Sequence, residues 1–226
     1  MFIGITAGQA VLPAAFSAGS GEIANTGSIC RRLVATDAWR TRSLAGYSVR
    51  RRYILSHGNS STPAEMMVKL DYSYPGHKSF RIISENNCDY LESRVLHRVL
   101  DAEVQAARDD IRDKTKIVPR NYDFDLLGTA DLDGRSSYVI RVIPKRKQRF
   151  LVNGKIWVDT QDAAVTRLDG EAATGSFWVR HLHIFQRYER VGPFWLVRFT
   201  RNEATVRFIG DAHLDIESFD YRLRSA

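Results

Sequence analysis

The pair His181 and His183 is the clearest place in this chain where residue type and spacing could support chemistry. Residues two apart on a β-strand point to the same face, so the two imidazoles would lie side by side and could begin a metal site. A zinc site needs at least three protein ligands, and no third ligand is close in the sequence. We interpret the pair as structural and expect neither a metal nor a cofactor.

Catalytic motifs offer no better candidate. The sequence has no G-x-S-x-G elbow, no P-loop, no G-x-G-x-x-G after a strand and no H-E-x-x-H. Asp131-Leu132-Asp133-Gly134 carries two acids, but a new strand follows directly, which is typical of a turn rather than of an acid/base pair. We therefore expect no catalytic residue and no enzyme activity.

Aromatic and basic residues are interleaved in the second half of the chain, an arrangement that could stack nucleic-acid bases. Half-buried strands produce the same interleaving, and the short stacking motifs of known nucleic-acid-binding modules are absent. We interpret the aromatic residues as core or cavity lining and expect no nucleic-acid partner. They are Trp157, Phe177, Trp178, Phe185, Phe194 and Trp195.

Length and composition are those of a packed globular protein. The chain of 226 residues is long enough for one large all-β or α+β domain, and 44% of it is hydrophobic. The net charge of +7 favours acidic partners, such as anionic lipid headgroups or nucleic acid, without choosing between them. Two basic runs, Arg50–Arg52 and Lys145–Lys147, are either solvated strand faces or contacts for an anionic headgroup.

The segment 1–18 carries no charged side chain and is rich in small and apolar residues. It is similar to the apolar region and small-residue end of a secretory signal, with Ala15-Phe16-Ser17 as a cleavage site. The basic start of such a signal is missing, so either the true start lies upstream or the segment is simply an apolar leader. We interpret residues 1–20 as a signal-like leader and expect export.

The two cysteines, Cys30 and Cys88, are too few for a disulfide scaffold or a thiolate metal site. In an exported protein they could form one bridge across a long stretch of chain. They could equally be two separate buried thiols. The sequence leaves both alternatives open.

Hydrophobic periodicity predicts two helices. The first runs from about Ser28, a natural N-cap, to Ser43. The second runs from Tyr90 to about Arg112, where apolar residues recur at steps of three and four, with Asp89 as its cap.

The rest of the chain has strand patterns. Three early strands with short connections should form an antiparallel meander. Asn153-Gly154 favours a turn within one later run, and Gly170 ends another. The predicted strands cover residues 47–56, 65–74, 78–85, 122–131, 137–144, 148–159, 163–172, 176–188, 194–200, 203–209 and 211–221.

This number of strands restricts the architecture. An antiparallel sheet of about eleven strands twists too strongly to stay flat and open, so it must close, or curl and receive a cover on its concave face. The two helices are the available cover. We predict an α+β fold, an unclosed half-barrel of about eleven strands with two covering helices, as a single domain over residues 28–226.

One hairpin carries a family pattern. In Lys155–Gly170, Ile156-Trp157-Val158 precedes a polar turn, Asp159–Asp162, and Val165-Thr-Arg-Leu follows it. This resembles the G-x-[IL]-W-[VI]-D-…-V-x-R-x-[ED]-G hairpin of the LolA-like superfamily, which comprises periplasmic outer-membrane lipoprotein carriers and their lipid-binding relatives. Further similar segments, closest to uncharacterised bacterial members, are 44–47, 121–128, 132–134, 138–145, 188–196 and 214–221.

The resemblance implies a function in lipid or lipoprotein binding. A periplasmic carrier would shelter acyl chains in an apolar cavity during lipoprotein sorting or transport toward the outer membrane. A second function class is an envelope-stress sensor or regulatory binding protein of related fold, with a membrane-anchored protein partner. A basic nucleic-acid-binding module is the third alternative. We expect a monomer.

The alternation of apolar residues along the strands predicts which side chains line the cavity. They are Val68, Leu70, Phe80, Ile82, Ile140, Val142, Ile156, Val158, Leu182 and Ile184. The sequence does not fix which face is concave, because one bulge moves every later side chain to the other face. Trp157, flanked by Ile156 and Val158, is expected to be largely buried.

Overall fold

The structure is a computed structural model that describes residues 25–58, 62–175, 179–207 and 210–224. The predicted leader over residues 1–20, its cleavage site, and the side chains of Phe177 and Trp178 lie outside the described residues.

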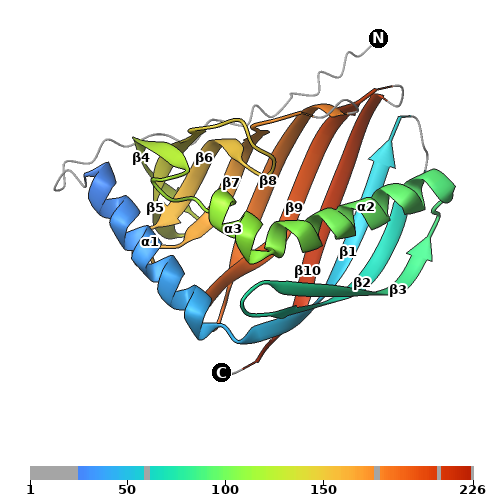
Figure 1. Cartoon of the computed structure of the whole chain (residues 1–226), viewed down its shortest axis with the longest axis horizontal. Coiled ribbons are helices and arrows are strands. Elements are labelled where there is room, and N and C mark those ends of the chain that lie inside the picture. The colour runs from blue at the N-terminus through green and yellow to red at the C-terminus, as the bar shows by residue number, and fades with distance from the viewer. Residues whose placement is uncertain (1–24, 59–61, 176–178, 208–209, 225–226) are drawn as a thin grey trace, which may run out of the picture.

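Ten antiparallel strands form one strongly curved sheet in the order β3-β2-β1-β10-β9-β8-β7-β6-β5-β4 (Figure 1). The first strand pairs with the last, so β3 and β4 are the two edges and the sheet does not close. The early meander of β1, β2 and β3 is confirmed. The strands are β1 Gly46–His57, β2 Ala64–Ser73, β3 His77–Asn86, β4 Tyr122–Leu132, β5 Arg135–Pro144, β6 Val152–Asp159, β7 Val165–Ala172, β8 Val179–Val191, β9 Phe194–Val206 and β10 Gly210–Arg224.

Three helices lie on the concave side: α1 Thr26–Ser43, α2 Tyr90–Ala107 and α3 Asp109–Thr115. The predicted α+β half-barrel with helical cover is thus confirmed, with ten strands and three helices in place of about eleven and two. The first helix begins earlier than predicted because Asn25, not Ser28, is its N-cap and accepts a hydrogen bond from the backbone N–H of Gly27 at 2.9 Å. Asp89 caps α2 as expected, in a capping box with Glu92.

The predicted second helix is interrupted at Arg108, whose extended backbone (ψ 140°) separates α2 from α3. The turn between β2 and β3 explains the break. Arg112 on α3 donates hydrogen bonds to the carbonyl of Pro75 and to the hydroxyl of Tyr72, the latter at 3.3 Å. Arg112 can make these contacts only because the chain changes direction after Ala107. A continuous helix would not change direction there.

Strand continuity differs from the predictions at three places. Residues 194–200 and 203–209, expected as two strands, are joined in β9, because Thr200, Arg201 and Asn202 pair with both β8 and β10. Asn153-Gly154 is not a turn but lies within β6, and Gly170 does not end its strand but lies within β7. These glycines face each other, and a Cβ on Gly154 would lie 2.4 Å from the Cα of Gly170, so the two backbones approach more closely than side chains permit.

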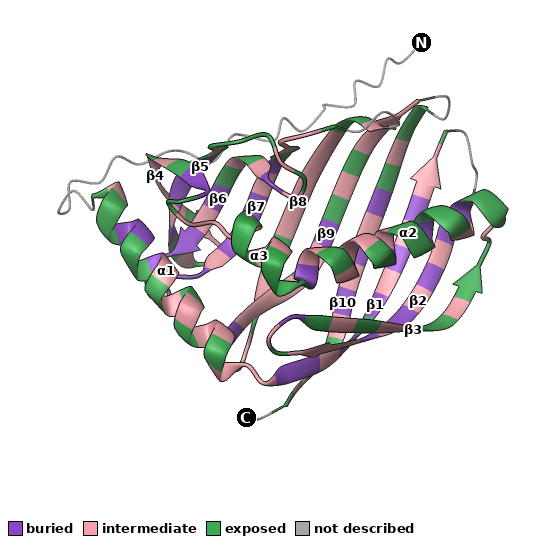
Figure 2. Ribbon diagram, viewed as in Figure 1, coloured by how far each residue is buried: buried purple, intermediate pink, exposed green. Residues whose placement is uncertain are grey.

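The two longer helices each cover a packed part of the concave face (Figure 2). Ile29 and Leu33 of α1 cover β4–β7, where they contact a buried cluster that includes Ile140, Ile156 and Leu168. Leu96 and Leu100 of α2 cover another cluster on β1, β2 and β10. Cys30 and Cys88 are both free, so of the two alternatives the separate thiols are found.

Candidate functional site

An apolar cavity of about 520 Å³ lies between α2 and strands β8, β9 and β10 on the concave side of the sheet. This volume is within the range of small-molecule sites, roughly 300–1,000 Å³. Most of its wall is aliphatic. The lining includes Leu55, Val95, Val99, Ala102, Ala106, Phe150, Val179, Leu182, Ile184, Val197, Ala204, Val206, Ala212, Leu214 and Ile216.

The cavity lies on one side of α2 because the helix is attached along its other side. Glu92 near the start of α2 contacts the His57 imidazole of β1 at 3.0 Å, and His97 contacts Glu85 of β3 at 2.9 Å. Leu96 and Leu100 are buried against β1 and β2. Since α2 packs on β1, β2 and β3, its opposite stripe faces β8–β10 without filling the space there.

A group of three charged side chains forms one wall of the cavity. Glu103 of α2 accepts hydrogen bonds from Arg51 of β1 at 2.5 Å and from the hydroxyl of Tyr53 at 2.8 Å. The ammonium of Lys78 on β3 lies 3.4 Å from the same carboxylate. Arg51 is only 6% exposed, so this is a buried ion pair with a second cation beside it.

The electrostatics of this charged group follow from its burial. The Arg51 guanidinium and the Lys78 ammonium outweigh the desolvation of Glu103 and lower its pKa to about 2. Burial also lowers the pKa of Lys78, although Glu103 opposes the shift. The carboxylate is therefore charged at neutral pH, and it balances only one of its two cationic neighbours.

Polarity changes along the length of the cavity. Thr200 on β9 pairs with Gln186 on β8 and with Ile216 on β10, two residues from the Ser218 that pairs with Arg51, so these polar side chains gather near the end where α2 finishes. Asn202 adds a polar side chain midway along the slot, and beyond it the paired positions are apolar, as in Leu182 with Ala204. Thr200 and Val206 on β9 are separated by roughly 20 Å of strand, at about 3.3 Å per residue. The site is an elongated slot with one polar and one apolar end.

Phe150 adds a wall from the loop before β6. Its backbone has φ 69°, a left-handed conformation uncommon for a bulky residue. The neighbouring Arg149 packs over the Phe150 ring at 4.5 Å and donates a hydrogen bond to the side chain of Gln105 on α2 at 3.2 Å. The loop thus extends the cover of α2 over the cavity.

The predicted lining residues divide into three sets. Leu182 and Ile184 lie in the cavity wall. Phe80 is half-buried and packs against the clusters near α2, while Ile82 on the edge strand is 37% exposed. The others are fully buried in the packed core: Val68 and Leu70 on β2, and Ile140, Val142, Ile156 and Val158 beneath α1.

The charged group was missed by the sequence reasoning, although a signal was present. Arg51 stands between the inward-facing Val49 and Tyr53 of β1, and Glu103 follows Val99 by one helical turn on the apolar stripe of α2. A charge at an inward position is uncommon unless it is paired. In the run Arg50–Arg52, only the central residue faces the concave side; Arg50 and Arg52 make exposed ion pairs.

The hairpin that carries the family pattern serves structure rather than the cavity. Asp159, which is 1% exposed, binds Arg135 through two hydrogen bonds of 2.6 and 2.9 Å and accepts two more from the backbone N–H groups of Gln161 and Asp162. These bonds confirm the predicted tight polar turn. Trp157 is not in the core as expected but half-buried on the convex face, because it alternates with the inward Ile156 and Val158; Arg167 lies 4.5 Å over its ring.

The other aromatic residues that were predicted to be core or cavity lining differ in their burial and in the face of the sheet on which they lie. Phe194 is buried, and Trp195 donates a hydrogen bond to Asp162 at 3.0 Å. Phe185 is on the convex face beside Arg167, at 4.7 Å, so it does not line the cavity.

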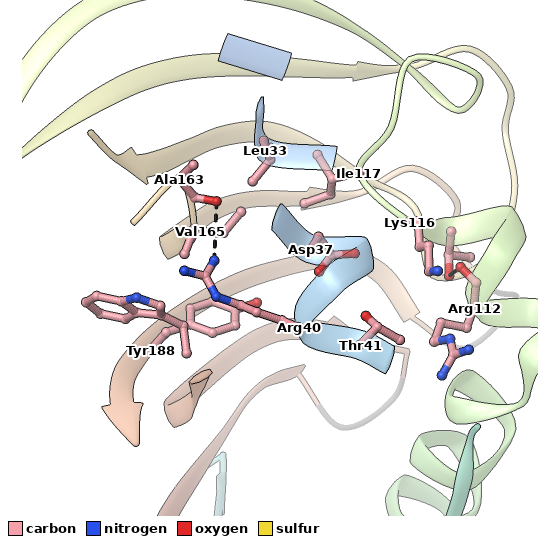
Figure 3. A pocket seen from close by; sticks show the side chains of 13 residues that line it. Leu33, Asp37, Arg40, Thr41, Arg112, Lys116, Ile117, Ala163, Val165 and Tyr188 are labelled. Carbon is pink, nitrogen blue, oxygen red and sulfur yellow. Dashed lines mark hydrogen bonds between the residues drawn. The ribbon is translucent and has the colours of Figure 1, made fainter. Parts of the chain in front are cut away.

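A second, more polar pocket of about 330 Å³ lies where α1 approaches α3 (Figure 3). Asp37, Arg40 and Thr41 of α1 face it from one side, and Arg112 and Lys116 from the other. Arg40 donates to the carbonyls of Asp162 and Ala163, at 2.7 and 3.4 Å. These interactions connect helix to turn, and they leave this pocket a weaker candidate for a ligand than the apolar cavity.

Within ranges 25–58, 62–175, 179–207 and 210–224, no group of three or more His, Cys, Asp or Glu is arranged to hold a metal ion; His183 instead contacts Asp169 at 2.8 Å. No helix in those ranges is both long and apolar enough to cross a membrane.

The fold and cavity define an open antiparallel half-barrel with a helix-covered slot. A model of a family of unknown function (DUF5686) matches residues 118–214. No curated protein matches.

Several solved structures are similar to this chain, among them the following three. A candidate outer membrane lipoprotein-sorting protein domain from Vibrio parahaemolyticus has 13% identity and a TM-score of 0.48, with 88% of this chain and 94% of that chain covered. A DUF1329 family protein from Desulfovibrio piger has 14% identity and a TM-score of 0.47, with 88% and 92% covered. A LolA superfamily protein from Nitrosomonas europaea has 11% identity and a TM-score of 0.42, with 89% and 94% covered. The similarity to LolA-like proteins that the sequence predicted is thus found over most of the chain, and it concerns the fold.

Proposed function

We propose that this protein binds lipid or lipoprotein acyl chains in the cavity beneath α2 and carries them in the periplasm by reversible sequestration, without catalysis. The observation that supports this most directly is the elongated slot of about 520 Å³ with an aliphatic wall. Transfer of an acyl chain into such a wall contributes about 0.8 kcal/mol per buried methylene. One covered chain would therefore bind firmly without any specific polar contact.

The position of the slot favours reversible uptake. It opens beside α2 and is partly covered by the Phe150 side chain, so a movement of this side chain would widen the entrance while Leu96 and Leu100 of α2 stay packed. A carrier needs this combination, because the cargo has to leave as well as enter. The proposed periplasmic location rests on the leader-like sequence over residues 1–20.

The test is a titration with a fluorescent fatty acid on the wild type and two matched variants. Leu182→Glu places a carboxylate in the cavity wall, where an acyl chain would desolvate it, so we expect uptake to weaken by at least tenfold while folding is retained. His181→Glu adds the same charge at the neighbouring, exposed position on the other face of β8, and should bind as the wild type does. Absence of saturable binding by the wild type would refute the proposal.

A further inference from the structure

The charged group at the polar end of the cavity has an excess of one positive charge. Of the residues that line the cavity, Arg51 and Lys78 are cationic and Glu103 is anionic. Both cations contact the same oxygen of Glu103, at 2.5 and 3.4 Å, and the other oxygen is occupied by the Tyr53 hydroxyl. The Glu103 carboxylate thus accepts from three donors and balances one of its two cationic neighbours.

Several hydrogen-bond donors in this group are unused. The Nε–H of the buried Arg51 has no hydrogen-bond partner among the described residues. Lys78 has three N–H donors, of which its contact with Glu103 uses one. A buried donor without a partner is destabilising, so a group of this kind is stabilised by an additional acceptor.

The rest of the cavity lining indicates the chemical nature of the ligand that would carry this acceptor. From the charged group the slot continues past Gln186, Thr200 and Asn202 to an aliphatic end formed by Leu182, Ala204 and Val206. A ligand that satisfied both ends would be an amphiphile with a polar head beside Lys78 and a tail directed toward Val206. The volume limits the tail: if each carbon takes about the 30 Å³ that a water molecule occupies in the liquid, about 520 Å³ holds roughly seventeen carbons.

We infer that the cavity selects a single-chain amphiphile whose headgroup carries one negative charge, a long-chain carboxylate being the simplest, with the headgroup held by Lys78 and Arg51. This inference rests on the proposed function and specifies its ligand class. One headgroup charge matches the excess of one positive charge, whereas a phosphate monoester brings about −1.5 to −2. One long acyl chain is enough to fill the volume of the slot.

The experiment compares ligands that differ only in headgroup, by displacement of the neutral fluorescent probe N-phenyl-1-naphthylamine from the full chain. Palmitate should displace the probe at a concentration at least about tenfold lower than 1-hexadecanol, a difference of about 1.4 kcal/mol, since a charge-assisted hydrogen bond is stronger than a neutral one. Lysophosphatidylglycerol, with one charge on a phosphodiester, and zwitterionic lysophosphatidylcholine complete the set. If palmitate displaces the probe at the lower concentration, the headgroup is that of a fatty acid. If lysophosphatidylglycerol does so, the headgroup is that of a lysophospholipid.

Lys78→Met is the decisive variant because it removes the excess cation and leaves the pair of Arg51 with Glu103 intact. It should bind hexadecanol as the wild type does and lose the preference for palmitate. Lys78→Arg should keep the preference, and Lys69→Met, at an outward-facing lysine of β2, should not change it. Circular dichroism and thermal unfolding confirm that each variant is folded.

The outcomes separate the two proposals. Equal displacement by palmitate and hexadecanol in the wild type would overturn the headgroup assignment and leave the carrier function standing. Retention of the palmitate preference in a folded Lys78→Met would also overturn it, because the anion would then be bound elsewhere. If the wild type binds neither the probe nor any ligand, the carrier function itself fails.

Discussion

Glu103 is the residue on which the buried charges depend. Its removal in Glu103→Gln leaves Arg51 and Lys78 together without a carboxylate, and we expect a loss of about 3–5 kcal/mol in unfolding free energy at pH 7. Urea unfolding measures it. The exposed Glu217→Gln on the convex face of β10 is the matched control and should change stability by less than about 0.5 kcal/mol.

The same variant predicts a pH dependence. The pKa of Glu103 is about 2 in the folded protein, below its ordinary value of about 4.3, so the carboxylate contributes its full stabilisation above about pH 4.5. That contribution is lost as the pH falls through the folded-state pKa. The stability difference between wild type and Glu103→Gln should therefore shrink between pH 4.5 and 2. A difference that stayed constant over this range would show that Glu103 does not carry the charge assigned to it.

At the scale of elements, the attachment of α2 depends on the turn between β2 and β3. A Cβ on Gly76 would lie 2.3 Å from the carbonyl oxygen of Ala107, the last residue of α2, so Gly76→Ala must displace the helix end or the turn. We expect a loss of about 1–3 kcal/mol, measured by thermal unfolding. Because this contact holds α2 against the sheet, uptake of a lipid probe should change as well.

Gly27→Ala is the control for this substitution. Gly27 lies in the first turn of α1, where a Cβ would meet Asn25 at an ordinary 3.4 Å. Alanine is the better helix former by about 0.8–1.0 kcal/mol, so the variant should be as stable as the wild type or slightly more so. Equal tolerance of both substitutions would mean that the α2 end is not fixed by the turn.

At the scale of the whole molecule, the carrier role requires export. In its native host we expect the protein to be processed between about Ala14 and Ser20, the region with the small residues that a signal peptidase requires. N-terminal sequencing of protein recovered from a periplasmic fraction measures this directly. Recovery of an intact Met1 from the cytoplasm would contradict both the leader and the proposed location.

The sequence by itself determined the architecture. Period-two alternation and regular turn residues defined most of the strands, and a sheet with so many of them must curl and be covered. The capping of α2 by Asp89 and the polar turn at Asp159 were also readable, because these signals are local. Local signals failed where longer-range pairing decides: Asn153-Gly154 and Gly170 look like turn residues but permit β6 and β7 to approach closely.

Only the tertiary structure decided where the sheet is packed and where it is hollow. Ile140 and Leu182 have similar patterns in the sequence, yet α1 buries the first and α2 leaves the second in a cavity wall, because each helix covers only part of the concave face. The grouping of Arg51, Lys78 and Glu103 likewise joins β1, β3 and α2, segments whose proximity no local pattern encodes. The fold could be predicted from short-range periodicity. The cavity and its charged group could not, because they depend on how the helices pack against strands that are distant in the sequence.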